Sequence, residues 1–319
     1  MPELGILGTL VLDTIHPPPG SGAPVVSDWG GIAYALAAFE ASRPPGWTAV
    51  PLVRVGSDVR AAADELLARF DGIARRDGVV TVPEPNNRVE LFYGSRTDRC
   101  ERLAGGVSGW PWEELREAAL SCDALYVNLV AGWELDVEVG ARLRSEFPGR
   151  LYGDIHSLLL GTGEEGVRVR RRIDDWPAWR GLFDVVQMNE DELATLTGTV
   201  GPEAGAAEDA EARAILEAGA EVVFVTRGSA GADWWERAGR RVRRGVAPPA
   251  ATAGRDVDPT GCGDVWGVVA AVSLVAGADP GEAAFRANRF AAAAAGHRGT
   301  DGLAATLARV AAGPAGGTG

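Results

Sequence analysis

The chain contains no lysine, and all 31 of its basic side chains are arginines. This absence excludes a Walker-type phosphate-binding lysine, the strand lysine of protein kinases, and Schiff-base or pyridoxal chemistry. A nucleotide site in this protein must therefore rely on backbone amides, arginine and a metal ion. A GC-rich genome also produces arginine in place of lysine, but the chemical exclusion holds in either case.

Cysteine and histidine are almost as scarce, with three of each in 319 residues. Cys100, Cys122 and Cys262 are odd in number and show no paired spacing, which favours a reduced, cytoplasmic setting. The three histidines lie far apart in the sequence, so no structural zinc site is predicted.

Long apolar runs and a surplus of basic charge are missing too. No segment is apolar over the length that a bilayer span requires, and the N-terminus lacks the basic start of a signal peptide. The net charge of −13 disfavours a nucleic-acid partner. The basic run at 168–172 is soon followed by acidic residues and is interpreted as a solvated helix face. We expect a cytoplasmic globular protein that binds neither membranes nor nucleic acids.

The most informative stretch that is present, residues 258–267, reads DPTGCGDVWG and leads into an apolar helix. Gly261 and Gly263 leave the backbone amides uncovered, and a helix start adds unpaired N–H groups and a positive dipole end. Such a turn holds an anion, most naturally a phosphate. Asp264 would repel that phosphate unless it takes a proton from an attacking hydroxyl. The stretch therefore predicts phosphoryl transfer to an alcohol, with a structural loop before a core helix as the alternative.

Strand and helix patterns alternate along most of the chain. Strands are predicted at 4–12, 50–55, 124–129, 151–155, 185–188 and 222–226, and helices at 30–41, 61–70, 135–145, 191–196, 207–218, 263–276 and 280–296. This alternation predicts an α/β fold, a three-layer sandwich with a mainly parallel central sheet. Ligands of such sheets bind at the carboxyl ends of strands. Asp13, Asn189, Arg227 and Asp264 all fall where a predicted strand has just ended or a helix begins.

Taken in order, these motifs resemble the ribokinase-like carbohydrate kinase family, also called the PfkB family, over residues 8 to about 303. Residues 258–264 are similar to its C-terminal signature, aspartate-x-threonine-glycine-alanine-glycine-aspartate. The resemblance implies a glycine turn that forms an anion hole and an aspartate that acts as catalytic base. These roles pass to Gly261, Cys262, Gly263 and Asp264, with Cys262 in place of the usual alanine.

Further motifs are similar to the nucleotide-binding residues of the family. Residues 189–192 resemble its asparagine-x-x-glutamate motif, which organises magnesium and phosphate, and 226–231 resemble a threonine-x-glycine-x-x-glycine turn beside the nucleotide phosphates. The implied ATP-binding residues are Asn189, Glu192, Thr226, Arg227, Gly228, Gly231 and Asn288, with Asn189 and Glu192 holding Mg²⁺ through water. Local alternatives exist, because Asn189 and Glu192 also form a capping box, 226–228 could open a hairpin, and Asn288 could be an ordinary helix residue.

Asp13 and the pair Gly30-Gly31 match family positions that hold the hydroxyls of the substrate. Asp13 alone could simply cap a turn. Another acidic segment, Asp154-Ile155-His156, could approach the phosphates through metal-bound water, but a structural strand end is the preferred interpretation.

The sugar pocket departs from that of ribokinase, because apolar side chains replace hydrogen-bonding ones. The replacing residues are Ile32 and Ala35, in place of a lysine and an asparagine, and Val11 and Val130, in place of an asparagine and a glutamate. Loss of such partners weakens the binding of hydroxyls. We expect an acceptor that is less polyhydroxylated than ribose or that carries an apolar or aromatic part, such as a nucleobase.

The resemblance implies one ribokinase-like kinase domain over residues 1–312 and a flexible tail at 313–319. Lid segments at about 14–28 and 79–104 would exclude water, and in this family the lid often forms a dimer interface, so a homodimer through the lid is one option. Monovalent cation binding near Asp258 and Thr260 stays open. The alternative is a catalytically silent nucleotide- or metabolite-binding regulator of the same fold. A hydrolase or dehydrogenase is disfavoured, because Gly-x-Ser-x-Gly and a dinucleotide fingerprint are absent.

Overall fold

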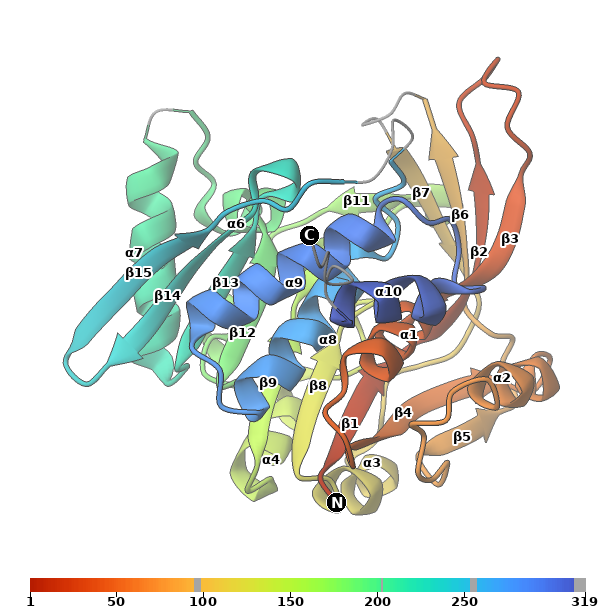
Figure 1. Cartoon of the computed structure of the whole chain (residues 1–319), viewed down its shortest axis with the longest axis horizontal. Helices are drawn as coiled ribbons and strands as arrows, with labels where there is room; N and C mark the ends of the chain where they lie inside the picture. Colours follow the sequence, from red (N-terminus) through yellow and green to blue (C-terminus); the bar gives the residue numbers. More distant parts are fainter. Residues whose placement is uncertain (95–98, 202, 253–256, 313–319) are drawn as a thin grey trace, which may run out of the picture.

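A nine-stranded sheet forms the centre of the molecule (Figure 1). The computed structural model describes residues 1–94, 99–201, 203–252 and 257–312, so the expected tail and residues 95–98 of the expected lid lie outside it. The strand order is β15-β14-β13-β12-β9-β8-β1-β4-β5, and only the β13–β14 and β14–β15 pairs are antiparallel. The strands are β1 (Glu3–Gly8), β4 (Thr48–Gly56), β5 (Val79–Val82), β8 (Ala124–Asn128), β9 (Arg150–Asp154), β12 (Val185–Asn189), β13 (Val222–Thr226), β14 (Ala232–Ala238) and β15 (Arg241–Ala247). The predicted mainly parallel sheet is confirmed.

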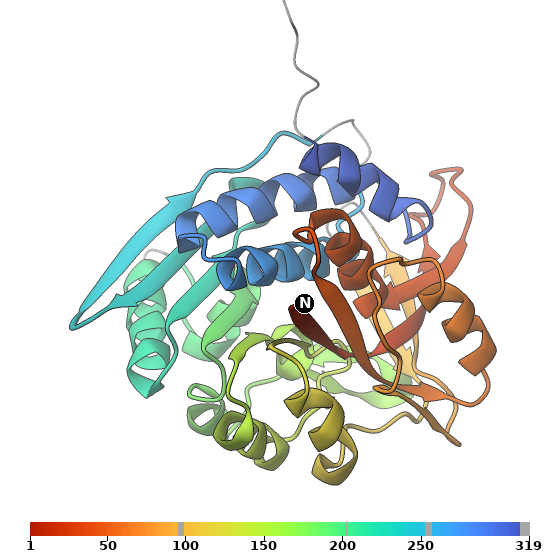
Figure 2. The ribbon, with the colours of Figure 1, turned by 60° about the horizontal axis from the view of Figure 1, so that its bottom comes forward.

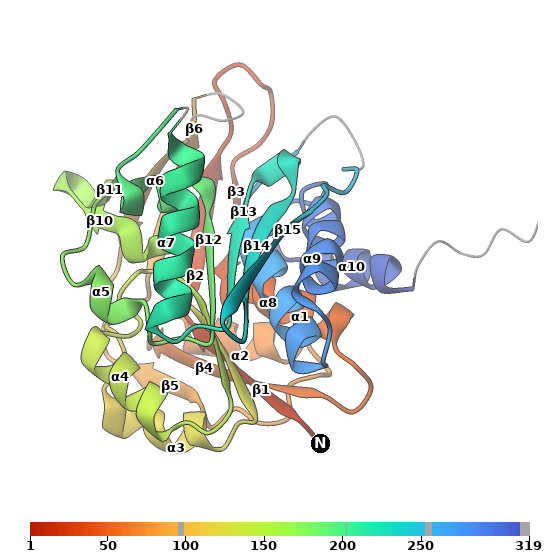
Figure 3. The same ribbon diagram turned by 90° about the vertical axis from the view of Figure 1, so that its left-hand side faces the viewer.

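The central strands are apolar on both faces, and this property requires a layer of helices on each side. In β13, Val222 and Phe224 belong to one core cluster, whereas Val223 and Val225 belong to the other. The three layers are visible edge-on in Figure 3. The three-layer α/β sandwich that the sequence predicts is therefore present.

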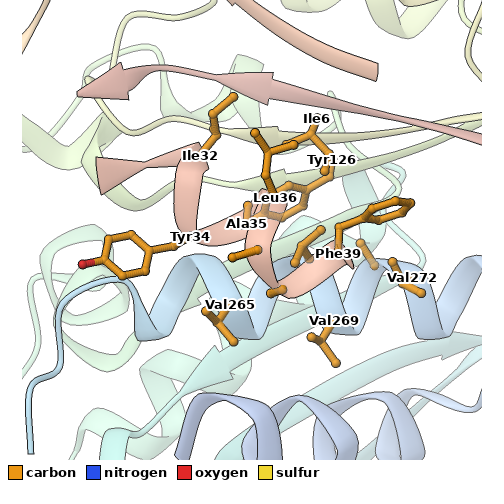
Figure 4. Close-up of a cluster of buried hydrophobic side chains, with 14 of the residues drawn as sticks. Ile6, Ile32, Tyr34, Ala35, Leu36, Phe39, Tyr126, Val265, Val269 and Val272 are labelled. Carbon is orange, nitrogen blue, oxygen red and sulfur yellow. The ribbon is translucent and has the colours of Figure 1, made fainter. Parts of the chain in front are cut away.

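Two groups of helices cover the sheet, as Figure 2 shows by their colours. The first core cluster contains α1 (Ile32–Ser42), α2 (Arg60–Leu67), α8 (Cys262–Val275), α9 (Pro280–Ala294) and α10 (Leu303–Ala311). The second contains α3 (Trp112–Leu120), α4 (Val137–Glu146), α5 (Trp176–Trp179), α6 (Glu190–Thr197) and α7 (Ala204–Ala218). Helices α1 and α8 are apolar on almost every face, because they pack against each other as well as against the sheet (Figure 4).

A second sheet of four strands projects from one end of the body and forms the lid (Figure 1). Its order is β3-β2-β6-β7, with β2 (Leu10–His16), β3 (Val26–Gly31), β6 (Arg88–Tyr93) and β7 (Arg99–Ala104). The predicted lid segment from residue 79 needs correction, because β5 pairs in parallel with β4 in the central sheet. The lid segment instead begins at β6.

The single strand predicted at 4–12 is wrong. Strand β1 ends at Gly8, and after Thr9 the chain enters β2 of the lid. Leu10 and Val11 are buried, so the apolar run continues across the change of sheet and hides it from a periodicity argument. Asp13 consequently lies within β2 and not after a strand end.

The interpretation of 168–172 as a helix face is also wrong. Arg168–Arg170 forms β11, which pairs with β10 (Leu160–Thr162) in a hairpin beside the lid. The Arg168 side chain is only 2% exposed. In the described part of the chain, no helix is both long and apolar enough to cross a membrane.

Candidate active site

The glycine turn before α8 adopts a conformation that requires glycine at its first position. Gly261 is the N-cap of α8 with φ 74°, in the left-handed region. A Cβ at this position would lie 2.2 Å from the ring of Tyr34, which comes from α1. The amide of Cys262 donates to the Pro259 carbonyl at 3.2 Å, which closes the turn. The turn is thus shaped by its own backbone and by a tyrosine that the sequence argument did not identify.

Asp264 lies in the first turn of α8 and is held by a residue that the sequence analysis missed. The side-chain amide of Asn128, the last residue of β8, donates to Asp264 Oδ1 at 2.5 Å. Asn128 is fully buried. A polar residue at the carboxyl end of a central strand is the signal that could have marked it.

Tyr34 joins the glycine turn to the expected substrate site. Burial raises the pKa of its phenol well above the usual range, and the charges of Asp13, Asp258, Asp264 and Asp28 raise it further. The phenol is therefore neutral at ordinary pH. In Figure 4 its hydroxyl points away from the apolar side chains between α1 and α8. This tyrosine places the predicted base and the predicted substrate-binding aspartate in one electrostatic environment.

The structure brings the three predicted substrate-binding residues together at the base of the lid. Asp13 of β2 is opposite Asp28 of β3 and is 6% exposed. A Cβ on Gly30 would come within 1.9 Å of Asp13 Oδ2. Gly31 has φ 60°, and its Cβ would meet the Thr9 carbonyl at 2.2 Å. Glycine at position 30 therefore leaves room for the Asp13 carboxylate, and glycine at position 31 permits the positive φ and the close approach of the Thr9 carbonyl.

The surroundings of this site are largely apolar. Val11 is buried in a small cluster with lid residues, and Val130 packs against it. A cavity of about 250 Å³ lies next to the glycine turn. Its lining residues are Ile15, Pro17, Pro18, Ser21, Ala23, Pro24, Val26, Tyr93, Val257, Asp258, Pro259 and Arg298. A hydrogen bond of 2.9 Å between the hydroxyls of Tyr93 and Thr260 connects the lid to the turn.

Asn189 and Glu192 form the predicted capping box at the start of α6. Glu192 accepts from the backbone N–H and the side-chain amide of Asn189 at 2.7 and 2.6 Å. It also pairs with His156 Nδ1 at 2.9 Å. Burial alone would lower the pKa of His156, but the Glu192 hydrogen bond and charge outweigh it and raise that pKa to about 9. A capping box formed by Asn189 and Glu192 is compatible with the expected role of the same residues in holding Mg²⁺ through water.

Asp154, at the end of β9, is more than a strand terminus. Its buried carboxyl accepts from Gln187 Nε2 at 2.9 Å and from the Tyr126 hydroxyl at 3.3 Å. Gln187 also donates to the Gly263 carbonyl at 3.3 Å. Burial raises the pKa of Asp154 to about 8, although the charge of His156 acts in the opposite direction. A layer of buried polar groups therefore links the sheet to the glycine turn.

No cluster of three or more histidine, cysteine or acidic side chains among the described residues could hold a metal ion directly. Magnesium does not require such a cluster, because it usually keeps several waters and binds one or two carboxylates together with substrate phosphates. The buried Glu192 carboxylate and the Asn189 amide fit this second kind of site.

The other predicted nucleotide-binding side chains are used in contacts within the protein. Arg227 follows β13 and donates to Glu208 at 2.5 Å and to Asp233 at 3.0 Å. The amide of Asn288 on α9 donates to the carbonyls of Ala247 and Pro248, and its oxygen accepts from Trp266. Gly228 and Gly231 have positive φ angles of 51° and 97°, so the turn after Thr226 also depends on glycine. The charge of Arg227 is largely compensated by its two partners.

Residues 170–306 match the family model described as "pfkB family carbohydrate kinase". No curated protein matches the sequence. Ribokinase from Thermotoga maritima is 18% identical, with a TM-score of 0.70, 98% of this chain covered and 100% of that one. Arabidopsis thaliana ribokinase, complexed with ribose and ATP, is 19% identical, with a TM-score of 0.67 and 96% and 98% covered.

A pyrophosphate-dependent kinase in the ribokinase family, complexed with a pyrophosphate analog and myo-inositol, is 17% identical. Its TM-score is 0.71, with 95% of this chain and 99% of that one covered. At such low identities the likeness to these structures shows the fold, which is ribokinase-like.

Proposed function

Because residues 170–306 match the pfkB carbohydrate kinase family model and the fold is ribokinase-like, we propose that this chain transfers the γ-phosphate of ATP to a hydroxyl of a small sugar-like or nucleoside-like substrate. The observation that carries the proposal is the placement of Asp264 in the first turn of α8. There it is held by Asn128 and follows a glycine turn whose backbone requires glycine at Gly261. A carboxylate beside an anion-binding helix start suits a base that deprotonates an alcohol.

In the proposed mechanism the acceptor hydroxyl lies between Asp13 and Asp264. Asp264 takes the hydroxyl proton as the oxygen approaches the γ-phosphorus, and the bond from that phosphorus to the leaving ADP breaks. A positioned base of this kind contributes about 10²–10⁴ in rate. The backbone of the turn at 261–263 stabilises charge on the transferring group, where one donor is worth about 10²–10³. Magnesium, bound through water to Asn189 and Glu192, would neutralise charge on the phosphates. The lid keeps water away from the reacting groups.

ATP is the proposed donor, and pyrophosphate is the alternative. The alternative is supported by the structural relative that uses pyrophosphate. It is also favoured by the internal contacts of Arg227 and Asn288, two of the residues expected to contact the nucleotide. Supplying each donor separately, with magnesium, distinguishes the two.

The acceptor is proposed to be less polyhydroxylated than ribose or to carry an apolar or aromatic part. The apolar cavity beside the glycine turn supports this choice, as do Val11 and Val130 at the base of the lid. Comparable efficiency with ribose and with the best nucleoside would contradict it.

The test measures phosphate transfer from ATP or pyrophosphate across a panel of sugars, polyols, sugar phosphates and nucleosides. We expect turnover with a restricted set of acceptors and a loss of at least about 10² in kcat for Asp264→Asn. Asp301→Asn, at a carboxylate that is 92% exposed, is the matched control and should retain full activity. ATP binding without turnover on any acceptor would favour the regulator instead. Equal activity of Asp264→Asn and the wild type would show that Asp264 is not the base.

A further inference from the structure

Asn128 is a buried polar side chain at the carboxyl end of a central strand, where it is in register with Asp154 of β9. It ends β8 between β1 and β9, and its neighbours Val127 and Leu129 are fully buried. Asn128 itself has no exposed surface. An apolar residue would fill this space without the cost of burying an amide. The amide therefore needs an explanation beyond packing.

The orientation of the amide follows from the chemistry of its partner. An ionised carboxylate only accepts hydrogen bonds, so Asn128 must present Nδ2 to Asp264 Oδ1. Its own Oδ1 then faces elsewhere, and this oxygen is buried without a hydrogen-bond partner among the described residues. A buried acceptor of this kind is destabilising unless something donates to it.

We propose that Asn128 is a positioning residue for the general base, an inference that rests on the proposed function. Its Nδ2–H fixes the plane of the Asp264 carboxylate and favours the ionised form. The separation of 136 residues between the two side chains means that helix α8 and strand β8 must both be in place before the base is aligned.

Two substitutions remove the donor to Asp264, one with a second charge and one without. Asn128→Asp keeps an acceptor oxygen but removes the donor and places a second carboxylate beside Asp264. Asn128→Leu removes both ends at similar volume. Loss of the donor should lower kcat by about tenfold to a hundredfold and shift the acid limb of the pH–kcat/KM profile to higher pH. Neither substitution should raise KM by more than a few-fold, because Asn128 has no exposed surface for the acceptor to contact.

The experiment measures kcat, KM and their pH dependence for both variants with the best acceptor of the panel. The control is Ser42→Ala, which removes another buried polar group without a side-chain partner, at the far end of α1. The control should leave kcat and the acid limb unchanged. If Asn128 only stabilises the fold, its variants will lower the unfolding temperature while the pH profile and the ratio of KM to kcat stay as in the wild type. That result would overturn the inference.

A second measurement does not depend on turnover. Carboxyl ¹³C signals of labelled aspartate, with Asp264→Asn to assign the signal, report the titration of Asp264 directly. We expect its midpoint to move to higher pH in Asn128→Leu and not in Ser42→Ala. An unchanged midpoint overturns the inference even if the wild type is active. If the midpoint shifts but the protein phosphorylates no acceptor, the effect of Asn128 on Asp264 is supported and the proposed function is contradicted.

Discussion

Asp154 shows how one buried side chain sets a pH dependence. Its carboxyl has an ordinary pKa of 3.8 in the unfolded chain, and burial raises this to about 8 in the fold. The folded state therefore favours the protonated form. Because the folded pKa is the higher one, the stability that this group supports is fully present below about pH 4. It is lost progressively as the pH rises through about 8.

We predict that Asp154→Asn reduces this loss. The amide is neutral at every pH, so its variant should lose less unfolding free energy between pH 5 and 8 than the wild type. The difference accumulates at up to about 1.4 kcal/mol per pH unit. Urea denaturation at a series of pH values measures it, with Asp301→Asn as an exposed control. Parallel curves for wild type and Asp154→Asn would contradict the prediction.

At the scale of an element, the two glycines at the start of α8 have different structural requirements. Gly261 needs its left-handed φ and the space now occupied by Tyr34. Gly263 has no heavy atom within 4 Å of a built Cβ and no positive φ, so the fold does not require a glycine there. The two positions of one motif should therefore tolerate substitution differently.

We expect Gly261→Ala to lower kcat/KM by at least about 10², because moving the turn misplaces the donors of the anion hole. The left-handed backbone should also cost about 1–2 kcal/mol of stability. Gly263→Ala keeps its amide and should stay within a few-fold of the wild type. Steady-state kinetics and thermal unfolding of both variants test this pair. An equal loss in the two would mean that the turn has no special requirement at Gly261.

At the scale of the whole molecule, the lid is attached to the body by a buried arginine. Arg168 of β11 lies 3.8 Å from Glu101 of β7, stacks over Trp133 and donates to the carbonyls of Ala131 and Ser157. An isolated antiparallel β-bridge also pairs the backbone of Arg102 in β7 with that of Val167. The β10–β11 hairpin thus fastens the outer strand of the lid to the central domain.

Arg168→Ala should loosen this attachment. Removing one partner of a buried ion pair costs about 3–5 kcal/mol, and amides of β7 should exchange faster with deuterium. Arg170→Ala, in the same strand, removes an exposed pair with Asp191 and should cost less than about 1 kcal/mol. Hydrogen–deuterium exchange and urea denaturation compare the two. Unchanged exchange in β7 for Arg168→Ala would show that the lid is held elsewhere.

The sequence by itself determined the parallel sheet, the helix layers and the glycine turn before Asp264. These features depend on local patterns, which are strand and helix segments in alternation, glycines just before a helix and polar residues at strand ends. The capping box of Asn189 and Glu192 was predictable for the same reason, since both partners lie within one helical turn.

Only the tertiary structure decided which distant groups meet. The contacts of Asn128 with Asp264 and of Tyr34 with Gly261 join residues that no local pattern relates. The break between β1 and β2 at Thr9 could not be predicted, because an apolar strand has the same sequence pattern in either sheet. The burial of Arg168 could not be predicted either, because it depends on partners that other segments of the chain supply. Local backbone preferences act over a few residues, whereas the alignment of the base and the attachment of the lid arise from packing between segments far apart in the chain.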